Sequence, residues 1–549
     1  MPVSQPERVA IIGGGCTGIT SFWALQNSGH DVHIFEASDA LGGRIKSLPF
    51  EHEGIQTNVN SESSVYNIEA SPNLDSLLRY LGVSTIRHRF GVRATDGDRS
   101  SWWSDSILQS ILIQPWILCC KETYVILSDI IWLKFLAIDV LCKDVSPYRA
   151  RNIESLLSAK RYLAKEGYSA SFRDEYLAPI LSVLWGTNTG KLLSRLPIEA
   201  AIRCLYDHQL LWPRQNVPRW RSIERGASHL VQVLSRDFDP SRVHLKAKVR
   251  RVTRYDKKVY RLVTADGRER DFNRIIFAVD SEDIMHILGP LASAQDRKII
   301  GGLGTTKNIS VLHSDSLVGE GVKSSIQFLP GEGWGSAAHQ LGRLLLEREH
   351  STTAYTYVLE PIVPGRSSED STPRKSSLSY NVNALDSVSA SLYGPFYITL
   401  NPIMPPHPSI VQSVYEFTEP DPSFSTLQAQ NDLALIQNKR DLSYGFCWTG
   451  RGHLEDAITA GLRIAIEDLN AEVPFPVEFH PVPFAADLPR PSLGLPFHII
   501  RTLLRLLQLL VLVLELLMPL LPGPASRFIV HRHRHLSRQE PGKPSRQGE

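Results

Sequence analysis

The chain has 549 residues, 42% of them hydrophobic and 21% charged, which is the composition of an ordinary globular protein. Its formal net charge of +2 gives no general case for nucleic-acid binding, and its six cysteines show neither metal-ligand spacing nor a disulfide framework. The length predicts more than one domain. The first seven residues lack the apolar core of a signal peptide, so we expect no secretion.

Residues 9–36 predict a strand, a glycine turn, a helix and a second strand, which is the arrangement that binds a dinucleotide. Gly13 allows a tight turn, Gly15 lets the backbone approach a pyrophosphate, and Gly18 lets the helix pack on the strand. The N–H groups at the helix N-terminus suit phosphates, and Glu36 can accept the ribose hydroxyls. The candidate cofactor-binding residues of this unit are Gly13, Gly14, Gly15, Thr17, Gly18 and Glu36.

A second pair of glycines follows the second strand, in Leu41-Gly42-Gly43-Arg44. Another close backbone approach together with a cation suits a larger, diphosphate-bridged cofactor. This stretch resembles the flavin-containing amine oxidase and phytoene desaturase superfamily, and later segments are closest to its branch of predicted NAD/FAD-binding oxidoreductases. The resemblance implies that Gly42, Gly43 and Arg44 help to hold FAD rather than a diffusible nicotinamide.

The resemblance also implies the fold class, which is α/β. It comprises a Rossmann-like FAD-binding domain of the glutathione-reductase type, an interleaved α+β substrate domain and a hydrophobic C-terminal helix. We expect the FAD-binding domain to consist of residues 1–95, 215–305 and 425–475. The other expected parts are a helical part of the substrate domain at 96–214, its sheet at 306–424, and the membrane-associating helix with a basic tail at 490–549.

Three features concern the substrate side. The branch carries Asp-x-Gly-Phe where this chain has Asn60-Ser61-Glu62-Ser63, beside the family's flavin cavity, so the family's substrate and activity need not carry over. Residues 102–141 are strongly apolar but interrupted by charges, which favours buried helices over membrane contact. His208 follows a helical stretch, where a hydrogen-bonded core histidine is the expected role and a catalytic base is the alternative.

Two further candidates rest on the resemblance alone. A valine of the superfamily that matches Val249 meets the adenine end of FAD through its backbone. Amine oxidases carry a lysine at a place similar to Lys307, where it holds a water against flavin N5. Lys307 is therefore the candidate catalytic residue, assisting flavin reoxidation, and a solvated strand lysine is the alternative.

Residues 444–465 predict a strand, a glycine loop and a helix. Gly450 allows a close backbone approach, and Glu455 and Asp456 lie at the helix start, where the helix dipole favours acids. In the superfamily this helix start faces the flavin, and an acid binds nearby hydroxyls. The resemblance therefore implies that Gly450, Glu455 and Asp456 bind the cofactor.

The C-terminal region is the most apolar part of the chain. Residues 509–521 are nearly all Leu and Val, and from Gly523 onward six Lys and Arg residues stand against two acids. We expect this helix to associate with a membrane, by spanning it or by lying in its interface, with the tail suited to anionic headgroups. The expected location is the cytoplasmic face of a membrane.

Together these features predict an FAD-dependent oxidoreductase that takes a hydride from a lipophilic substrate onto flavin N5. An acyl, polyene or terpenoid chain or a hydrophobic amine would suit the apolar regions. The alternatives are a redox-neutral flavin-dependent isomerase and an FAD-binding protein that has lost catalysis. We expect no metal and no nucleic acid, and the oligomeric state stays open.

Overall fold

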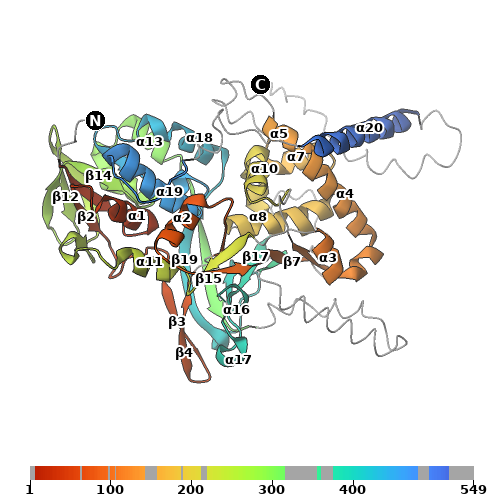
Figure 1. The fold of residues 1–549 in the computed structure, drawn as a ribbon, viewed down its shortest axis with the longest axis horizontal. Coiled ribbons are helices and arrows are strands. Elements are labelled where there is room, and N and C mark those ends of the chain that lie inside the picture. Colours follow the sequence, from red (N-terminus) through yellow and green to blue (C-terminus); the bar gives the residue numbers. More distant parts are fainter. Residues whose placement is uncertain are drawn as a thin grey trace, which may run out of the picture.

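Two bodies of different architecture lie side by side in the computed structural model of the chain (Figure 1). One is built on a parallel sheet and the other on a larger, mixed sheet with a helical layer. The structure describes residues 6–61, 65–88, 90–96, 99–104, 107–142, 157–186, 189–211, 219–315, 355–359, 375–386, 388–479 and 494–517.

The first body contains a five-stranded parallel sheet whose strands come from three distant parts of the chain. Its order is β10 (Val243–His244), β2 (Asp31–Phe35), β1 (Arg8–Ile12), β14 (Arg274–Phe277) and β20 (Leu442–Tyr444). The strands are short, apolar and buried on both faces, as parallel strands between layers require. One layer contains α1 (Cys16–Leu25), α2 (Pro72–Tyr80), α11 (Ala227–Ser235) and α19 (Leu454–Arg463).

The other layer contains a three-stranded antiparallel sheet and two helices. These elements are β11 (Val249–Asp256), β12 (Val259–Thr264), β13 (Glu269–Phe272), α12 (Ser281–Leu288) and α13 (Ala294–Ile300). Their apolar side chains pack with those of β1 and β14 in one core cluster. The parallel sheet is thus covered on both faces, which is the doubly wound arrangement that the sequence predicts.

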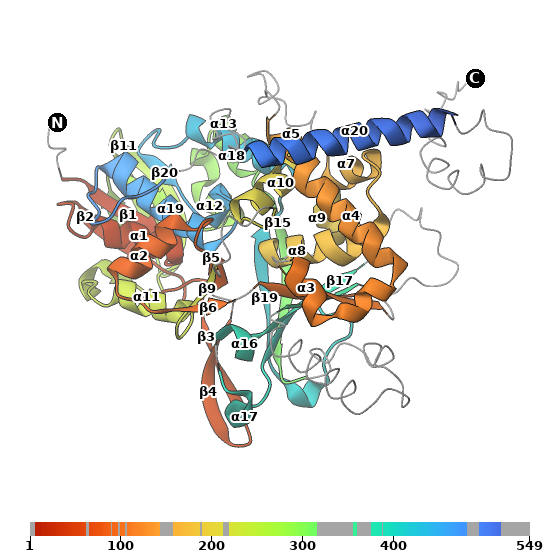
Figure 2. The same ribbon diagram turned by 45° about the vertical axis from the view of Figure 1, so that its right-hand side comes forward.

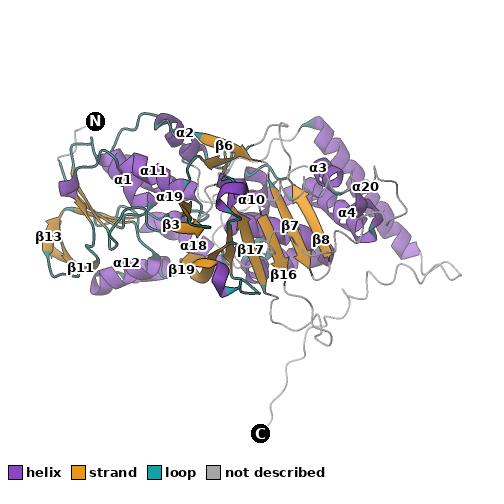
Figure 3. Ribbon diagram, turned by 90° about the horizontal axis from the view of Figure 1, so that it is seen from below, coloured by secondary structure: helices purple, strands orange, loops and turns teal. Residues whose placement is uncertain are grey.

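The second body is organised around a seven-stranded sheet (Figure 3). Its order is β19 (Val411–Pro420), β15 (Thr305–His313), β18 (Tyr397–Leu400), β17 (Ser376–Asn381), β16 (Tyr355–Leu359), β7 (Gly91–Asp96) and β8 (Arg99–Ser104). The pairs are antiparallel except β16 with β7. β7 corrects the expected domain boundary at residue 95, because this strand joins the substrate sheet and the first FAD-binding segment therefore ends before Gly91.

Helices form a layer next to β7 and β16 and share one large apolar core with them (Figures 1 and 3). They are α3 (Ile107–Ile113), η1 (Pro115–Cys119), α4 (Lys121–Leu136), α5 (Ile138–Cys142), α7 (Ala159–Lys165), η3 (Phe172–Leu177), α8 (Ala178–Trp185), α9 (Thr189–Arg195) and α10 (Ile198–Asp207). Ile126, Ile130 and Leu133 of α4 are buried in this core. The prediction of buried helices within 102–141 is therefore confirmed for these positions.

Smaller elements connect the two bodies. The hairpin of β3 (Ser47–His52) and β4 (Ile55–Asn60) extends away from the parallel sheet, and β9 (Trp220–Ile223) pairs with both β5 (Val65–Asn67) and β6 (Thr85–His88). The first two parts of the cofactor body thus meet again where the chain returns from the helical layer.

The C-terminal apolar segment forms one long surface helix, α20 (Leu495–Leu517), which crosses the C-terminal end of α4 and continues past it (Figure 2). None of the helices in the described ranges combines the length and apolarity that a membrane crossing requires. The spanning form of the expected 490–549 element is therefore not supported there. The basic tail from residue 518 lies outside the described residues.

Candidate functional site

The glycine turn after β1 is closely packed against backbone atoms, which leave no room for side chains at two of its glycines. Gly13 has φ +108°, and a Cβ built on it would lie 2.4 Å from the carbonyl oxygen of Ala278. A Cβ on Gly18 would lie 1.9 Å from the carbonyl oxygen of Gly13. These two glycines are therefore required by strand-to-helix packing alone, whatever the turn binds.

Gly15 differs from Gly13 and Gly18, because no atom of the described residues requires the absence of its side chain. Its φ is −75°, which any residue can adopt, and a Cβ built on it would meet no atom within 4 Å. Gly15 lines a cavity of about 460 Å³ at the N-terminus of α1. Open space beside a glycine at a helix N-terminus fits a phosphate group of a bound nucleotide, so this cradle passes a test for FAD.

Glu36 holds its carboxylate at the edge of the same cavity. Oε2 accepts a hydrogen bond from Gly14 N at 2.7 Å, and Oε1 accepts from Ser38 N at 2.8 Å and Ser38 Oγ at 2.7 Å. A carboxylate fixed at the end of the second parallel strand is where ribose hydroxyls meet the protein in dinucleotide folds. The carboxylate would exclude a phosphorylated ribose because the two negative charges repel.

The second glycine pair builds the next wall of the cavity. Gly42 N donates to Gly14 O at 2.8 Å, and both Gly42 (φ +127°) and Gly43 (φ +61°) adopt conformations that favour glycine. Arg44 also lines the cavity, and its Nη1 donates to Thr418 O of β19 at 2.7 Å. Arg44 therefore connects the nucleotide-binding loop with the substrate sheet.

The third predicted segment divides between cofactor cavity and scaffold. Glu455 lines the cavity, but its carboxylate accepts from Asn73 N at 3.1 Å and Leu74 N at 2.7 Å, so it also caps the start of α2. Burial raises the pKa of Glu455 to about 7. Asp456 instead caps α19 by accepting from His453 N at 2.9 Å, and its side chain fills the space beside Gly450.

The cavity brings together most of the predicted cofactor residues. Those that line it are Gly13, Gly15, Thr17, Glu36, Gly42, Gly43, Arg44 and Glu455. Those that do not are Gly14, Gly18, Val249, Gly450 and Asp456. For Gly450 and Asp456, the cap of α19 accounts for both residues within the protein, and Val249 is buried where β11 begins.

The far part of the cavity is lined by side chains that the sequence did not single out. They come from the substrate sheet, α8 and the strand β9, and include Trp185, Trp220, Tyr355, Tyr380, Ile398, Leu400, Tyr415, Phe417 and Glu419. Alternation along β19 is the signal that could have found three of them, because residues 415, 417 and 419 share one face of a strand. The result is a mainly apolar and aromatic chamber that opens toward the glycine turn.

Lys307, the predicted catalytic residue, is not part of this chamber. It is exposed on β15, opposite Thr418, and it is not among the residues that line the cavity. Its neighbour Asn308 is buried and donates from Nδ2 to Glu419 Oε2 at 2.7 Å. Successive strand residues point to opposite faces, so Lys307 lies on the face away from the chamber, which agrees with the alternative of a solvated strand lysine.

His208 lies in the chamber as a buried, neutral group. Its Nδ1–H donates to Cys204 O at 2.9 Å, and its ring stacks on Trp220 with 5.6 Å between centroids. Burial, followed by the electrostatic effects of nearby His453 and then Arg451, holds the pKa of His208 well below its usual range. The expected hydrogen-bonded core role is thus confirmed, while the ring also lines the cavity as an uncharged group.

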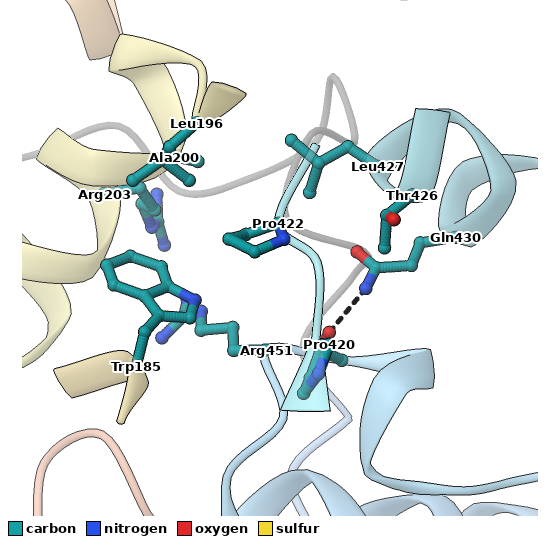
Figure 4. A pocket seen from close by; sticks show the side chains of 11 residues that line it. Trp185, Leu196, Ala200, Arg203, Pro420, Pro422, Thr426, Leu427, Gln430 and Arg451 are labelled. Atoms are coloured by element: carbon teal, nitrogen blue, oxygen red, sulfur yellow. Dashed lines mark hydrogen bonds between the residues drawn. The ribbon is translucent and has the colours of Figure 1, made fainter. Parts of the chain in front are cut away.

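A second, much smaller cavity of about 30 Å³ lies between α8, α10 and α18 (Phe424–Asp432), and Figure 4 shows its lining. This volume is room for about one water. Arg203 and Arg451 both reach it, and both form ion pairs with Asp207 at the end of α10. Asp207 thus neutralises two cations where the helical layer meets the glycine loop at 450–452.

The segment that departs from the family forms part of the scaffold. Asn60 Oδ1 accepts from Ser228 Oγ at 2.7 Å, and Asn60 Nδ2 donates to Asp386 Oδ2 at 3.3 Å. Ser61 lines the cavity, and its Oγ donates to Arg44 O at 2.9 Å. Glu62 and Ser63 lie outside the described residues.

Asp386 makes folding stability depend on pH. Burial raises the pKa of Asp386 to about 6, so the folded state favours the protonated acid, and stability falls as pH rises from about 4 through 6. Replacing Asp386 with Asn should keep an acceptor for Asn60 and raise the unfolding free energy at pH 8 by up to about 3 kcal/mol. Urea unfolding at pH 5 and pH 8 measures this effect.

The exposed Asp237→Asn variant is the control and should change neither value. An Asp386→Asn variant less stable than the parent at pH 8 would contradict the assignment, because it would show that the ionised carboxylate is favoured in the fold.

Sequence comparisons match two parts of the chain to known families. Residues 11–81 match the NAD(P)-binding Rossmann-like domain, and residues 120–312 match the flavin containing amine oxidoreductase family. Over 56 residues, the chain is 43% identical to the L-amino acid oxidases of Bothrops pictus and Bothrops atrox. That alignment covers 10% of this chain and 11% of each relative, so the chain spans about a tenth of the curated relatives that it matches.

The fold is similar to that of several solved enzyme structures. Putrescine oxidase bound to putrescine superimposes with a TM-score of 0.55 at 13% identity, covering 84% of this chain and 98% of that one. Cyclohexylamine oxidase from Brevibacterium oxydans gives 0.54 at 14% identity, with 84% and 99% covered. A fatty acid isomerase from P. acnes gives 0.52 at 14% identity, with 85% and 99% covered. At these identities the likeness concerns the fold.

Proposed function

Because the chain belongs to the flavin-containing amine oxidase superfamily, whose cofactor is FAD, we propose that it is an FAD-dependent oxidoreductase acting on a lipophilic substrate. The observation that carries the proposal is the continuity of one cavity. The cavity runs from Gly15 and Glu36 to Tyr380 and Phe417, so a nucleotide cradle and an apolar chamber share one space.

The cofactor would supply the redox chemistry by accepting a hydride from a substrate C–H bond at flavin N5. The residues of the chain have supporting tasks. Gly15 admits the diphosphate, Glu36 receives ribose hydroxyls, and Arg44 places a cation on the wall between cradle and chamber. The aromatic and aliphatic side chains of β18 and β19 exclude water and bind an apolar substrate part.

The alternatives separate in one experiment. Purified protein should show flavin absorbance bands that bleach when an oxidisable lipophilic amine or polyene is added without oxygen. A colourless protein that does not take up FAD would overturn the proposal. Bound flavin that no such compound bleaches would favour the isomerase, whose fold is represented among the similar structures, or a scaffold that has lost catalysis.

Lys307→Met provides a prediction for the oxidase reaction. Because Lys307 is exposed and lies off the cavity, the variant should reoxidise reduced flavin with oxygen at the rate of the parent. Stopped-flow absorbance after anaerobic reduction measures that rate, with the exposed Lys298→Met variant as control. If flavin reoxidation were slower in Lys307→Met than in the parent and in Lys298→Met, Lys307 would have a catalytic role after all.

The same proposal locates the protein at the cytoplasmic face of a membrane. A lipophilic substrate dissolves in a bilayer, and the exposed α20 offers a means of attachment.

A further inference from the structure

The helix α20 exposes its aliphatic side to solvent and turns a side that contains Arg501 toward the protein. The residues that it turns toward the protein are Phe497, Arg501, Leu504 and Gln508, which are partly buried and recur at helical spacing. The rings of Phe497 and Phe135 of α4 stack with 5.1 Å between centroids. Arg501 and Arg505 both form ion pairs with Asp139 of α5, so both cations on the described part of this helix are directed to the protein.

The opposite side of α20 is aliphatic and uncovered. Its residues with 41–74% exposure are Leu495, Ile499, Ile500, Leu503, Leu506, Leu507, Leu509, Leu510 and Val513. A surface helix normally buries its apolar stripe and presents its polar one. The polar residues His498, Thr502 and Arg505 form a narrow edge between the protein-facing strip and this aliphatic face.

The helical layer also exposes large apolar side chains. Leu108 and Leu112 of α3 are 66% and 63% exposed, and Tyr124 and Ile131 of α4 are 57% and 44% exposed. In α4, residues 124 and 131 lie seven apart, on the side away from the buried Ile130. Of these two helices, α4 packs on α20 near its C-terminal end, where Phe135 contacts Phe497, whereas α3 lies at the other end of the helical layer (Figures 1 and 2). The contiguous exposed apolar surface is therefore the one on α20 itself, which marks an interaction surface.

We propose that this face, defined as the exposed aliphatic residues of α20, binds the surface of an anionic membrane. α20 lies flat in the interface, because the ion pairs of Arg501 and Arg505 with Asp139 hold its inner side against the protein. The inference goes beyond the proposed oxidoreductase and does not depend on it.

Two observations favour lipid over a protein partner. The large hydrophobic side chains that the described part of α20 exposes are all Leu, Ile or Val, whereas protein interfaces are enriched in aromatic residues, Met and Arg and rely on them for hot spots. The chain that follows α20 is basic, with six Lys and Arg residues against two acids from Gly523 onward. Basic residues next to an apolar helix add attraction to anionic headgroups.

The test is sedimentation of the purified full-length chain with vesicles. Binding is expected to vesicles that contain phosphatidylglycerol, and weaker binding to vesicles of phosphatidylcholine alone. The triple variant Leu503→Glu, Leu506→Glu and Leu510→Glu should lose affinity for anionic vesicles by roughly tenfold or more. Each substitution replaces an aliphatic side chain that would enter the membrane interface with a charged one. Thermal unfolding of the variant should match the parent, since all three side chains are exposed.

The matched control alters three exposed apolar residues elsewhere, as Leu392→Glu, Met404→Glu and Leu435→Glu, and should bind vesicles like the parent. Failure of the parent to sediment with anionic vesicles overturns the proposal, as does undiminished binding by the α20 variant. Analytical ultracentrifugation adds a third outcome. A dimer that the α20 variant converts to monomer would identify a second copy as the partner and also overturn it. Neither measurement depends on flavin or turnover, so failure of the membrane proposal would leave the proposed oxidoreductase activity unaffected.

Discussion

Gly15→Val should produce a folded protein that no longer binds FAD. The added side chain meets no protein atom near its Cβ and the backbone at φ −75° accepts it, so the apoprotein should unfold within about 1 kcal/mol of the parent. The same side chain would occupy the space where a pyrophosphate approaches the start of α1. FAD affinity should therefore fall by roughly a hundredfold or more, measured by titration of flavin fluorescence against apoprotein.

The matched control is Gly494→Val. A Cβ at Gly494 would meet no described atom closer than 3.6 Å, and Gly494 precedes α20 and does not line the cavity. It should bind FAD like the parent. If Gly15→Val keeps the parental affinity, the cofactor does not sit in the cradle. If it unfolds instead, the glycine serves the fold rather than the ligand.

Asp207→Leu should destabilise the protein more than any other single ion-pair change described here. Asp207 accepts from Arg203 and from Arg451, both of them largely shielded from solvent, so its loss leaves two cations without their shared carboxylate. Removing one partner of a buried ion pair costs about 3–5 kcal/mol, because the remaining charge is desolvated. Guanidinium unfolding at pH 7 should show a loss of that order.

The comparison with Arg451→Met makes the argument specific. That variant leaves Asp207 paired with Arg203 at 3.0 Å, so it should cost clearly less than Asp207→Leu. The triple variant Asp207→Leu, Arg203→Met and Arg451→Met should recover much of the stability, because apolar groups replace all three charges. Equal losses in the two single variants would show that the carboxylate does not serve both arginines.

The nucleotide-binding half was predictable because its signals are local. Gly13, Gly15 and Gly18 lie within six residues of one another at the start of α1, so their spacing alone identifies the motif. Gly13 and Gly18 are required by packing, and Gly15 leaves open space at the cavity. Gly450 and Asp456 resemble a cofactor motif equally well. In the structure, however, Asp456 caps α19 and its side chain fills the space beside Gly450. A motif of glycine and acid at a helix start has two physical causes, and the sequence does not separate them.

The substrate chamber was not predictable, because its walls come from strands far apart in the chain. Whether Lys307 or Asn308 points inward depends on the register of β15 against β19, where one residue exchanges the two faces. For α20, apolar residues surround the whole helix after Leu509, so periodicity could not show that Arg501 faces the protein. The direction of a side chain was thus one main source of error; another was the start of the 102–141 region, where Trp102 and Trp103 lie in β8 rather than in a helix.

The interleaving of the parallel sheet has a consequence for how the chain folds. Ile12 of β1 pairs with Phe277 of β14, and Phe277 pairs in turn with Tyr444 of β20. Contacts at such sequence separation form slowly, because a long loop must close before any pairing repays its entropy. During synthesis, β1 and β2 therefore emerge long before their last neighbour exists, with strand edges and apolar faces uncovered. The protein should depend on chaperones until residue 444 has left the ribosome, and shortened chains should aggregate rather than bind nucleotide.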